Sequence, residues 1–495
     1  MTSKLFENRK LSRFDLAVML TVIALCTAIA LILWHGDQTP LQINYFSWAK
    51  EKIGVQDRSF TLGFNRPVDR KSIEQNLMIN PPLPGKISWQ GNQLFYTLTE
   101  LPVYGTQYQL QLKDARGRFN SNKLYALNEV FYSRDRVFAY IGLQGAERGK
   151  LIISTLNKTK DKFTTVKKTV LTPGDLVVTN FKVYPDGEKI LFSAFDPATV
   201  GLEVPQQQLF TVTTGLSFNT TTKIPPIGRI QRILDAQTYQ NLNFDLSSNG
   251  QTIIVQRVNY NNPADAGLWV ILEDGEIRPI GIRGDEFLLS PNGQKVAVSQ
   301  PGGVAMIPLT KNGGSPQFLS GYEKIIGFSR DGTKQIIVKL NYDYSRSLYQ
   351  MDERQGVRGI FRTTNSILGC QFEPRQEKTL YCLKTDLVIG DDNRIKEEPY
   401  LTIVDIATGQ DLPLLALPNS QDVQMSLSPD GKALLFDQVV AITNQTNNNL
   451  RGTNEPTIAN GQLWIFSTPQ NVNFSSSLNI TTQELNTGFK PCWFP

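Results

Sequence analysis

The chain has 495 residues, of which 40% are hydrophobic and 19% are charged. This length suits two or three domains, and this composition excludes general disorder. The mean hydropathy of -0.24 excludes a polytopic membrane protein. The net charge of +5 is concentrated at the start, because the first thirteen residues hold four Lys or Arg against one Glu. Beyond them and Asp15, 46 basic residues face 43 acidic ones, so we expect no nucleic-acid partner.

The sequence holds a single histidine, His35. Most catalytic triads and most zinc sites need an imidazole, so this count argues against large classes of enzyme. No G-x-S-x-G elbow, G-x-x-x-x-G-K-[ST] loop or G-x-G-x-x-G fingerprint occurs beyond the N-terminal apolar segment. We therefore predict no catalytic residue, no bound metal and no cofactor.

Residues 14–35 are predicted to form a transmembrane signal anchor. Leu16–Trp34 is a run of 19 residues without a charge, which as a helix spans about 28 Å, close to the thickness of the hydrocarbon core. The residues before it are basic, so the positive-inside rule places 1–13 in the cytoplasm and the rest of the chain on the other side. We expect a single-pass protein of the inner or plasma membrane whose bulk is periplasmic.

A cleaved signal peptide is the competing interpretation of this segment. It needs a shorter apolar region that ends in a small-x-small site. Ala28-Ile29-Ala30 has this pattern but lies inside the apolar run. Cys26 suggests a lipoprotein site, although Leu25 before it is larger than the residues that such sites usually carry.

Residues 44–133 are predicted to form a small β-sandwich. Short alternating runs recur here, and turns rich in Pro and Gly separate them, as is typical of a sandwich. Trp89 is expected to pack in the core rather than to bind a ligand. The expected strands are Phe60–Phe64, Leu77–Ile79, Gln93–Tyr96 and Tyr108–Leu112.

Three segments of this region resemble the bacterial Ig-like domain found in S-layer-type surface proteins. They are FNRPVDRKSI (Phe64–Ile73), INPPLPGKISWQGNQLFY (Ile79–Tyr96) and GTQYQLQLKDARG (Gly105–Gly117). Such domains usually act as spacers or adhesive modules. The resemblance therefore implies a stalk rather than an enzyme.

A hairpin phrase recurs through the rest of the chain. Its copies begin at Tyr184, Ser247, Ser290, Ser329 and Ser428, with a degenerate copy at Glu373, and Ser428-Pro-Asp-Gly431 is typical of them. The copies lie 63, 43, 39, 44 and 55 residues apart, and the short spacings match one four-stranded propeller blade. Pro presets φ, Asp or Asn accepts local hydrogen bonds and Gly supplies a positive φ. We interpret these aspartates as turn residues and not as catalytic ones.

An apolar strand follows each hairpin: Gln208–Val212, Leu268–Leu272, Val304–Ile307, Leu348–Met351, Leu401–Val404 and Leu463–Phe466. This order resembles the TolB-like and WD40-like propeller repeats. The resemblance implies an all-β chain whose residues 137–495 form a β-propeller. It does not indicate a function, because propellers host many.

The two ends of this region are predicted to build one blade together. Val137–Ile141 and Lys150–Leu156 look like the later strands of a blade that lacks its first strand. Gly488–Pro495 looks like a first strand without the others. Joining them closes the ring and removes exposed sheet edges. We expect seven blades, with six as the alternative.

The long connections are expected on one face of the propeller. With the strands of a blade labelled a to d, those between b and c are Asp196–Gln206, Asn259–Ala266, Leu387–Pro399 and Ala441–Gly461, and Ser217–Asn243 is interpreted as a d–a connection. In an up-and-down blade these two kinds of connection emerge on the same face, the loop face. The repeated a–b turns lie on the opposite face, the turn face. Loops on rigid scaffolds commonly carry function, so we expect binding at the loop face.

Six residues of the loop face are the candidates for contact with a partner: Tyr342, Tyr344, Arg346, Asp391, Asp392 and Arg394. Tyr and Arg are over-represented in interface hot spots. The alternative is that all six are merely solvated loop residues. Calcium is not expected at Asp391 and Asp392, because the spaced ligands of a calcium loop are missing.

Cys370 and Cys382 flank a candidate hairpin and could lie opposite each other across it. A disulfide would form there in an oxidising compartment, and a reduced buried pair fits the same pattern.

These patterns favour a non-catalytic, membrane-anchored envelope protein that presents a propeller to a partner outside the cytoplasm. The expected partner is an envelope protein, with a cell-wall polymer second. The alternative is an extracytoplasmic enzyme that acts on glycan through carboxylates on the loop face, since such chemistry needs only two acidic residues at one cavity.

Overall fold

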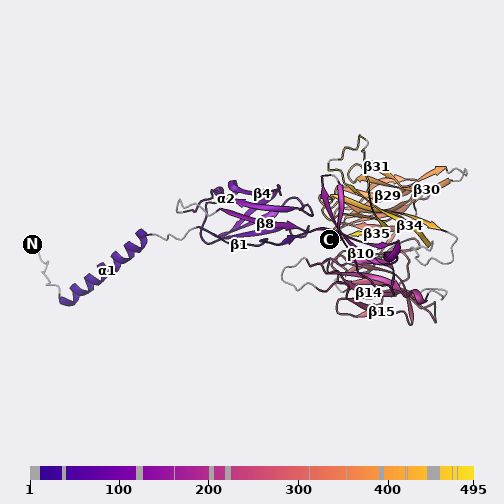
Figure 1. Ribbon diagram of the computed structural model, residues 1–495, viewed down its shortest axis with the longest axis horizontal. Coiled ribbons are helices and arrows are strands. Elements are labelled where there is room, and N and C mark those ends of the chain that lie inside the picture. Colours follow the sequence, from indigo (N-terminus) through magenta and orange to yellow (C-terminus); the bar gives the residue numbers. More distant parts are fainter. Residues whose placement is uncertain are drawn as a thin grey trace, which may run out of the picture.

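The computed structural model shows an N-terminal helix, a β-sandwich and a β-propeller, in that order along the chain (Figure 1). The all-β fold class with one N-terminal apolar helix is therefore as the sequence predicts. The structure describes residues 12–35, 41–118, 126–160, 162–199, 206–217, 225–310, 313–352, 354–389, 395–418, 420, 422–442, 457–470, 472–476 and 478–495.

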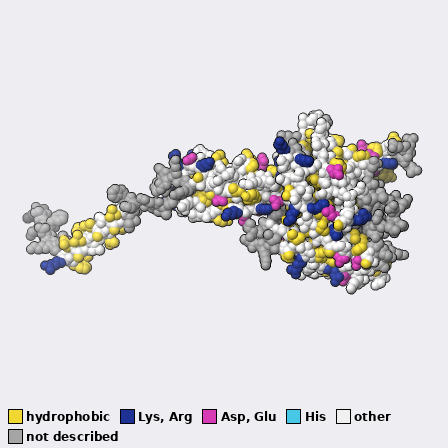
Figure 2. All heavy atoms as spheres, viewed as in Figure 1, with side chains coloured by type: hydrophobic (Ala, Val, Ile, Leu, Met, Phe, Trp, Pro, Cys, Tyr) yellow, Lys and Arg dark blue, Asp and Glu magenta, His cyan; other side chains and the backbone are white. Residues whose placement is uncertain are grey.

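Helix α1 (Arg13–His35) is apolar on every side. The stretch Arg13–Leu31 is long and apolar enough to cross a membrane, and none of it is buried against the rest of the chain. Figure 2 shows hydrophobic side chains gathered along this helix, whereas charged side chains are scattered over the sandwich and the propeller. A helix that is apolar all round needs an apolar environment, which both a membrane anchor and a signal sequence would find.

The sandwich consists of two four-stranded sheets that share one core. One sheet has the order β1 (Ile43–Phe46), β3 (Ser59–Phe64), β6 (Gln93–Leu98) and β5 (Gly85–Gln90). The other has the order β2 (Lys52–Ile53), β8 (Leu127–Ser133), β7 (Gln107–Leu112) and β4 (Leu77–Asn80). Leu62, Leu94 and Leu110, from both sheets, are completely buried in the shared core.

A short helix interrupts the strands of the sandwich. Helix α2 (Arg70–Asn76) begins where the Asp69 carboxylate accepts hydrogen bonds from the backbone of Lys71 and Ser72, which satisfies two donors of the first turn. Trp89 lies half-buried at the edge of the core. Its ring is 6.0 Å from that of Phe64 and its Nε1 donates to Glu74 over 2.8 Å, as suits a packing residue.

Five of the remaining sheets are separate four-stranded blades. Blade 1 contains β12 (Val177–Val183), β13 (Lys189–Phe195), β14 (Gln208–Thr213) and β15 (Ile230–Leu234). Blade 2 contains β16 (Tyr239–Leu246), β17 (Ile253–Asn259), β18 (Ala266–Ile271) and β19 (Ile277–Pro279). Blade 3 contains β20 (Phe287–Leu289), β21 (Lys295–Gln300), β22 (Gly303–Pro308) and β23 (Gln317–Ser320). Blade 4 contains β24 (Lys324–Phe328), β25 (Lys334–Leu340), β26 (Arg346–Asp352) and β27 (Gly356–Thr363). Blade 5 contains β28 (Ile367–Phe372), β29 (Thr379–Ile389), β30 (Ile395–Asp405) and β31 (Asp411–Ala416).

The last sheet contains two blades and closes the ring. Its strands are β32 (Met425–Leu427), β33 (Ala433–Ile442), β34 (Thr457–Ser467), β35 (Gln483–Trp493), β9 (Arg136–Gly142), β10 (Leu151–Thr159) and β11 (Lys162–Val170). The first half of β35 pairs with β34 as the outer strand of blade 6. Its second half pairs with β9, with Gly488 opposite Gly142 and Trp493 opposite Phe138, as the inner strand of blade 7. The ring of seven blades is thus closed by both ends of the propeller sequence, as predicted.

One connection lies on the other face from the one predicted. Residues 217–243 were expected to join strand d to the next strand a, but β15 lies within this range and pairs with β14. The long connection before β15 therefore joins c to d and belongs to the turn face. The sequence did not predict β15, because apolar and polar residues do not alternate strictly in Ile230-Gln-Arg-Ile-Leu234.

Two further connections begin and end in strands and not in loops. Leu387–Pro399 was expected to be a loop, yet β29 and β30 pair without interruption up to Ile389 opposite Ile395. Within Ala441–Gly461, β33 and β34 likewise pair up to Ile442 opposite Thr457. In blade 5 the apolar run Leu387–Ile389 continues β29 past its last pair with β28, so this hairpin extends beyond the blade.

Candidate functional site

The aspartates and asparagines of the repeated phrase are turn residues. In blade 6, the Ser428 hydroxyl donates to Asp430 Oδ1 over 2.6 Å, and the same oxygen accepts from the Lys432 backbone over 3.1 Å. Gly431 has a φ of +66°, which a glycine adopts without strain. Equivalent bonds join Ser290 to Asn292 and Ser329 to Asp331. These carboxylates are therefore engaged in local structure, as the turn interpretation predicts.

In the degenerate copy, the longer side chain of Glu373 accepts the hydrogen bonds that hold the turn. The Glu373 carboxylate accepts from the backbone of Gln376 over 2.9 Å and from Arg375 Nε over 2.7 Å. The turn is one residue longer, and Glu377 takes the positive φ, at +52°. A carboxylate thus replaces the Ser–Asp pair of the other copies.

The sandwich lies against the turn face of the propeller. The backbone of Tyr104 donates to the second oxygen of Asp430 over 2.9 Å. Arg134 Nη1 donates to the main-chain oxygen of Pro495 over 3.0 Å. Val55 and Gln56 of the sandwich line a hollow of about 700 Å³ at this end of the central channel. In Figure 1 the sandwich accordingly lies between α1 and the propeller. The turn face is therefore partly covered by the sandwich, and the loop face lies at the opposite end of the propeller.

Among the described residues, Tyr342 and Tyr344 are the most exposed of the large hydrophobic side chains. They are 107% and 82% exposed in the connection between β25 and β26. Asp343 holds this connection, because it accepts from the Ser345 hydroxyl over 2.6 Å and pairs with Arg362. The hydrogen bond from Ser345 is the main cause that lowers the pKa of Asp343. Two aromatic side chains are thus presented to solvent by a braced loop, as the prediction of partner contacts requires.

The other predicted contact residues are placed differently. Arg346 forms an ion pair, with its Nε 3.5 Å from Glu323 Oε2. Asp391, Asp392 and Arg394 lie outside the described residues. The sequence reasoning missed the apolar residues beside them: Leu387, Ile389 and Ile395 are 50%, 75% and 72% exposed. The apolar run Leu387–Ile389 was the signal that could have identified a longer strand there.

A second hollow opens at the loop-face end of the channel. It has a volume of about 410 Å³, and its lining includes Asp285, Glu286 and Lys324. Glu286 pairs with Lys324 over 3.3 Å, and Asp285 accepts from Gln256 over 2.7 Å. Both acidic residues are exposed and neighbours in sequence. A general acid of a glycosidase instead needs a carboxyl group kept protonated by an apolar surrounding.

Asp437 is a completely buried acidic residue whose pKa is strongly raised. Its carboxylate accepts from the backbone of Gln424 over 2.6 Å and of Lys490 over 2.7 Å. Burial raises the pKa of Asp437 to about 7, and burial also lowers the pKa of Lys490 to about 8. Asp437 lies on β33, and it ties that strand to the point where β35 passes from blade 6 to blade 7. Its position is structural, because both oxygens are occupied and none is exposed to a ligand.

The described ranges contain no group of three or more His, Cys, Asp or Glu side chains that could hold a metal ion.

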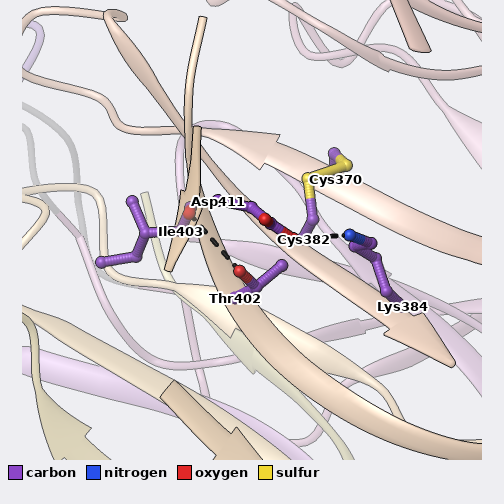
Figure 3. The surroundings of a disulfide bond; sticks show 6 residues. All are labelled: Cys370, Cys382, Lys384, Thr402, Ile403 and Asp411. Atoms are coloured by element: carbon purple, nitrogen blue, oxygen red, sulfur yellow. Dashed lines mark hydrogen bonds and ion pairs between the residues drawn. A yellow bond between two sulfur atoms is a disulfide. The ribbon is translucent and has the colours of Figure 1, made fainter. Parts of the chain in front are cut away.

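Cys370 and Cys382 form a disulfide in the structure. They lie directly opposite each other on β28 and β29. Figure 3 shows the bond beside Lys384, whose ammonium pairs with Asp411. Lys384 is buried, and its Nζ lies 4.6 Å from the centre of the Phe361 ring. The disulfide and this ion pair together fix the centre of blade 5, from which the long hairpin projects.

Breaking the disulfide is expected to destabilise the propeller. The bond closes a loop with a sequence separation of 12, for which loss of the cross-link costs about 2–3 kcal/mol. We expect the Cys370→Ala/Cys382→Ala variant to unfold at lower urea concentration than the wild type. Reductant should shift the wild type and Cys492→Ala, but not the double variant. An equal shift in all three proteins would contradict a structural disulfide.

The sequence matches no protein-family model and no curated protein. Among solved structures, the chain is similar to TolB from Acinetobacter baumannii at 13% identity, covering 83% of this chain and 82% of that one, with a TM-score of 0.37. It is also similar to a putative 6-phosphogluconolactonase from Bacteroides uniformis at 11% identity, covering 72% and 99%, with a TM-score of 0.44. A putative TolB from Agrobacterium tumefaciens shares 9% identity over 57% of this chain and 89% of that one, with a TM-score of 0.34. Likeness at this level transfers no function to this chain.

Proposed function

We propose that this chain is a non-catalytic envelope protein that α1 anchors in the membrane and whose propeller binds a protein partner with its loop face. The sandwich, as an Ig-like stalk, would hold the propeller away from the membrane, on the periplasmic side. The partner would contact Tyr342 and Tyr344, with a cell-wall polymer as the second class of partner.

The covered turn face is the observation that carries this proposal. Tyr104 and Arg134 donate hydrogen bonds from the sandwich to the propeller, and only 2% of Tyr104 is exposed. A partner that approaches the tethered protein therefore meets the loop face first. That face presents two braced tyrosines, and tyrosine supplies a large contact area at low cost in conformational entropy.

The glycan-acting enzyme is less well supported. Asp285 and Glu286 are the acidic residues in the loop-face hollow, and both already have polar partners. The buried Asp437 has a pKa of about 7 but does not line the loop-face hollow. If the enzyme interpretation were right, Glu286→Gln would abolish glycan cleavage by the purified full-length protein, whereas our proposal expects no cleavage by the wild type.

Co-purification from native membranes tests the proposed binding. The full-length protein would be extracted in mild detergent, and co-purifying proteins would be quantified by mass spectrometry. We expect one protein to be enriched with the wild type and to fall at least about tenfold with Tyr342→Ala/Tyr344→Ala, since loss of a hot-spot residue costs 2 kcal/mol or more. Phe318→Ala is the matched control, because Phe318 is 54% exposed but lies on the outer strand of blade 3.

A further inference from the structure

We propose that the projecting hairpin of blade 5 docks a protein segment whose apolar side chains are flanked by Lys or Arg. The site, called here the blade 5 ribbon, consists of residues 385–389 of β29 and 395–399 of β30. This inference rests on the proposed function and names a second contact region on the same face, together with the chemistry of the partner.

The blade 5 ribbon has lost its neighbours in the sheet. The pairing of β28 with β29 begins at Ile367 opposite Lys384, and that of β30 with β31 ends at Tyr400 opposite Ala416. Beyond these pairs only the base of the ribbon keeps backbone bonds to its neighbours, from Thr385 to Ser366 and from Leu417 to Pro399. The rest of β29 and β30 pairs with no third strand. An isolated two-stranded hairpin is at best marginally stable in water, so this one is expected to gain stability when it is covered.

One side of the blade 5 ribbon, called here its apolar side, exposes three apolar side chains together with Glu397, which pairs opposite Leu387. Ile389 lies opposite Ile395, so their side chains point to the same side, and Leu387 joins them because it is two residues away along β29. These three side chains are 50–75% exposed. The other side carries Asp386 opposite Glu398 and Val388 opposite Lys396. An exposed apolar surface rimmed by polar residues marks an interaction site.

The charges of the ribbon select the class of partner. Its described residues hold three acids, Asp386, Glu397 and Glu398, against one base, Lys396. Basic side chains elsewhere on this part of the loop face already have acidic partners, as Arg346 has Glu323 and Lys384 has Asp411. A basic segment is therefore complementary to this rim. A second copy of the chain would bring acidic rims together, and an anionic lipid surface would be repelled.

Face-specific photo-crosslinking tests the inference in the full-length protein in native membranes. Benzoylphenylalanine would replace Ile389 on the apolar side, and in a separate variant Lys396 on the opposite side of the same ribbon. We expect position 389 to give one discrete protein adduct, at least tenfold stronger than position 396, and lost when Ile395→Lys is added. Sequencing of the crosslinked peptide should find apolar residues with Lys or Arg within a few positions.

Several outcomes would overturn the inference. They are equal adducts from both sides of the ribbon, adducts only with lipid, with a second copy or within the same chain, and a crosslinked peptide without basic residues. The unfolding midpoint of Ile395→Lys should match the wild type, which separates loss of binding from loss of folding. If a partner co-purifies in a tyrosine-dependent way but no adduct forms at position 389, the inference fails while the proposed function stands. If neither occurs, both fail.

Discussion

Deleting residues 488–495 is expected to prevent the propeller from folding stably. This segment supplies the inner strand of blade 7 and pairs with β9. It also contributes Phe489, Trp493 and Phe494, which are 2%, 5% and 2% exposed. Loss of a buried aromatic side chain costs about 3–5 kcal/mol, so three of them rival the whole stability of a typical domain, about 5–15 kcal/mol. The deletion would also leave β9 as an open edge.

Limited proteolysis of the full-length protein in detergent would measure this effect. We expect the deletion variant to be cleaved within the propeller under conditions that leave the wild type intact. A milder variant, Trp493→Ala, should lower the free energy of unfolding by about 3–5 kcal/mol, while Phe318→Ala changes it by less than about 0.5 kcal/mol. A deletion variant as resistant as the wild type would mean that six blades close the ring without this segment.

Replacing Asp437 is expected to be the most damaging polar substitution in the propeller. Its carboxylate holds two backbone N–H groups, of Gln424 and Lys490, at the point where the chain closes the ring. Asp437→Ala leaves both donors buried without an acceptor, at about 1–3 kcal/mol each. We expect a total loss of roughly 2–6 kcal/mol, measured by urea unfolding of the full-length protein. Asp437→Asn keeps one acceptor oxygen and should lose less.

The stability of the wild type and that of Asp437→Asn should also differ in their dependence on pH. The pKa of Asp437 is raised from 3.8 to about 7 by burial, so the folded state keeps a proton that the unfolded state releases. The wild type should therefore lose stability as pH rises from about 4 to about 7. Asp437→Asn should lack this part of the decline. Above pH 8 the lowered pKa of Lys490 acts in the opposite direction, since the unfolded state then binds more protons. A decline of equal size in both proteins would show that Asp437 does not cause it.

The propeller could be predicted because its signals are local and repeated. Each a–b turn needs the same residues at the same spacing, so Ser428-Pro-Asp-Gly431 and its relatives identify the blades without any long-range information. Ring closure could be predicted because both incomplete halves, near Val137 and near Phe489, lacked what the other had. That Cys370 could lie opposite Cys382 followed from the same hairpin logic, which left a disulfide and a reduced pair as alternatives.

What could not be predicted depends on contacts between distant residues. Nothing near Asp430 in sequence indicates that its second oxygen binds the backbone of Tyr104, 326 residues away. The closure by Asp437 likewise joins strands that lie far apart along the chain. Helix α2 was missed because it is only seven residues long and depends on one capping aspartate. The blade 5 ribbon was interpreted as a loop because its charged tip resembles one.

Recovery of a partner from native membranes tests the central claim of loop-face binding most directly. The amount of co-purified partner would be compared between the wild type, Tyr342→Ala/Tyr344→Ala and Phe318→Ala at equal levels of the full-length protein. We predict at least about tenfold less partner with the tyrosine variant and unchanged recovery with Phe318→Ala. Equal recovery with all three proteins, or no specific partner with the wild type, would contradict the claim.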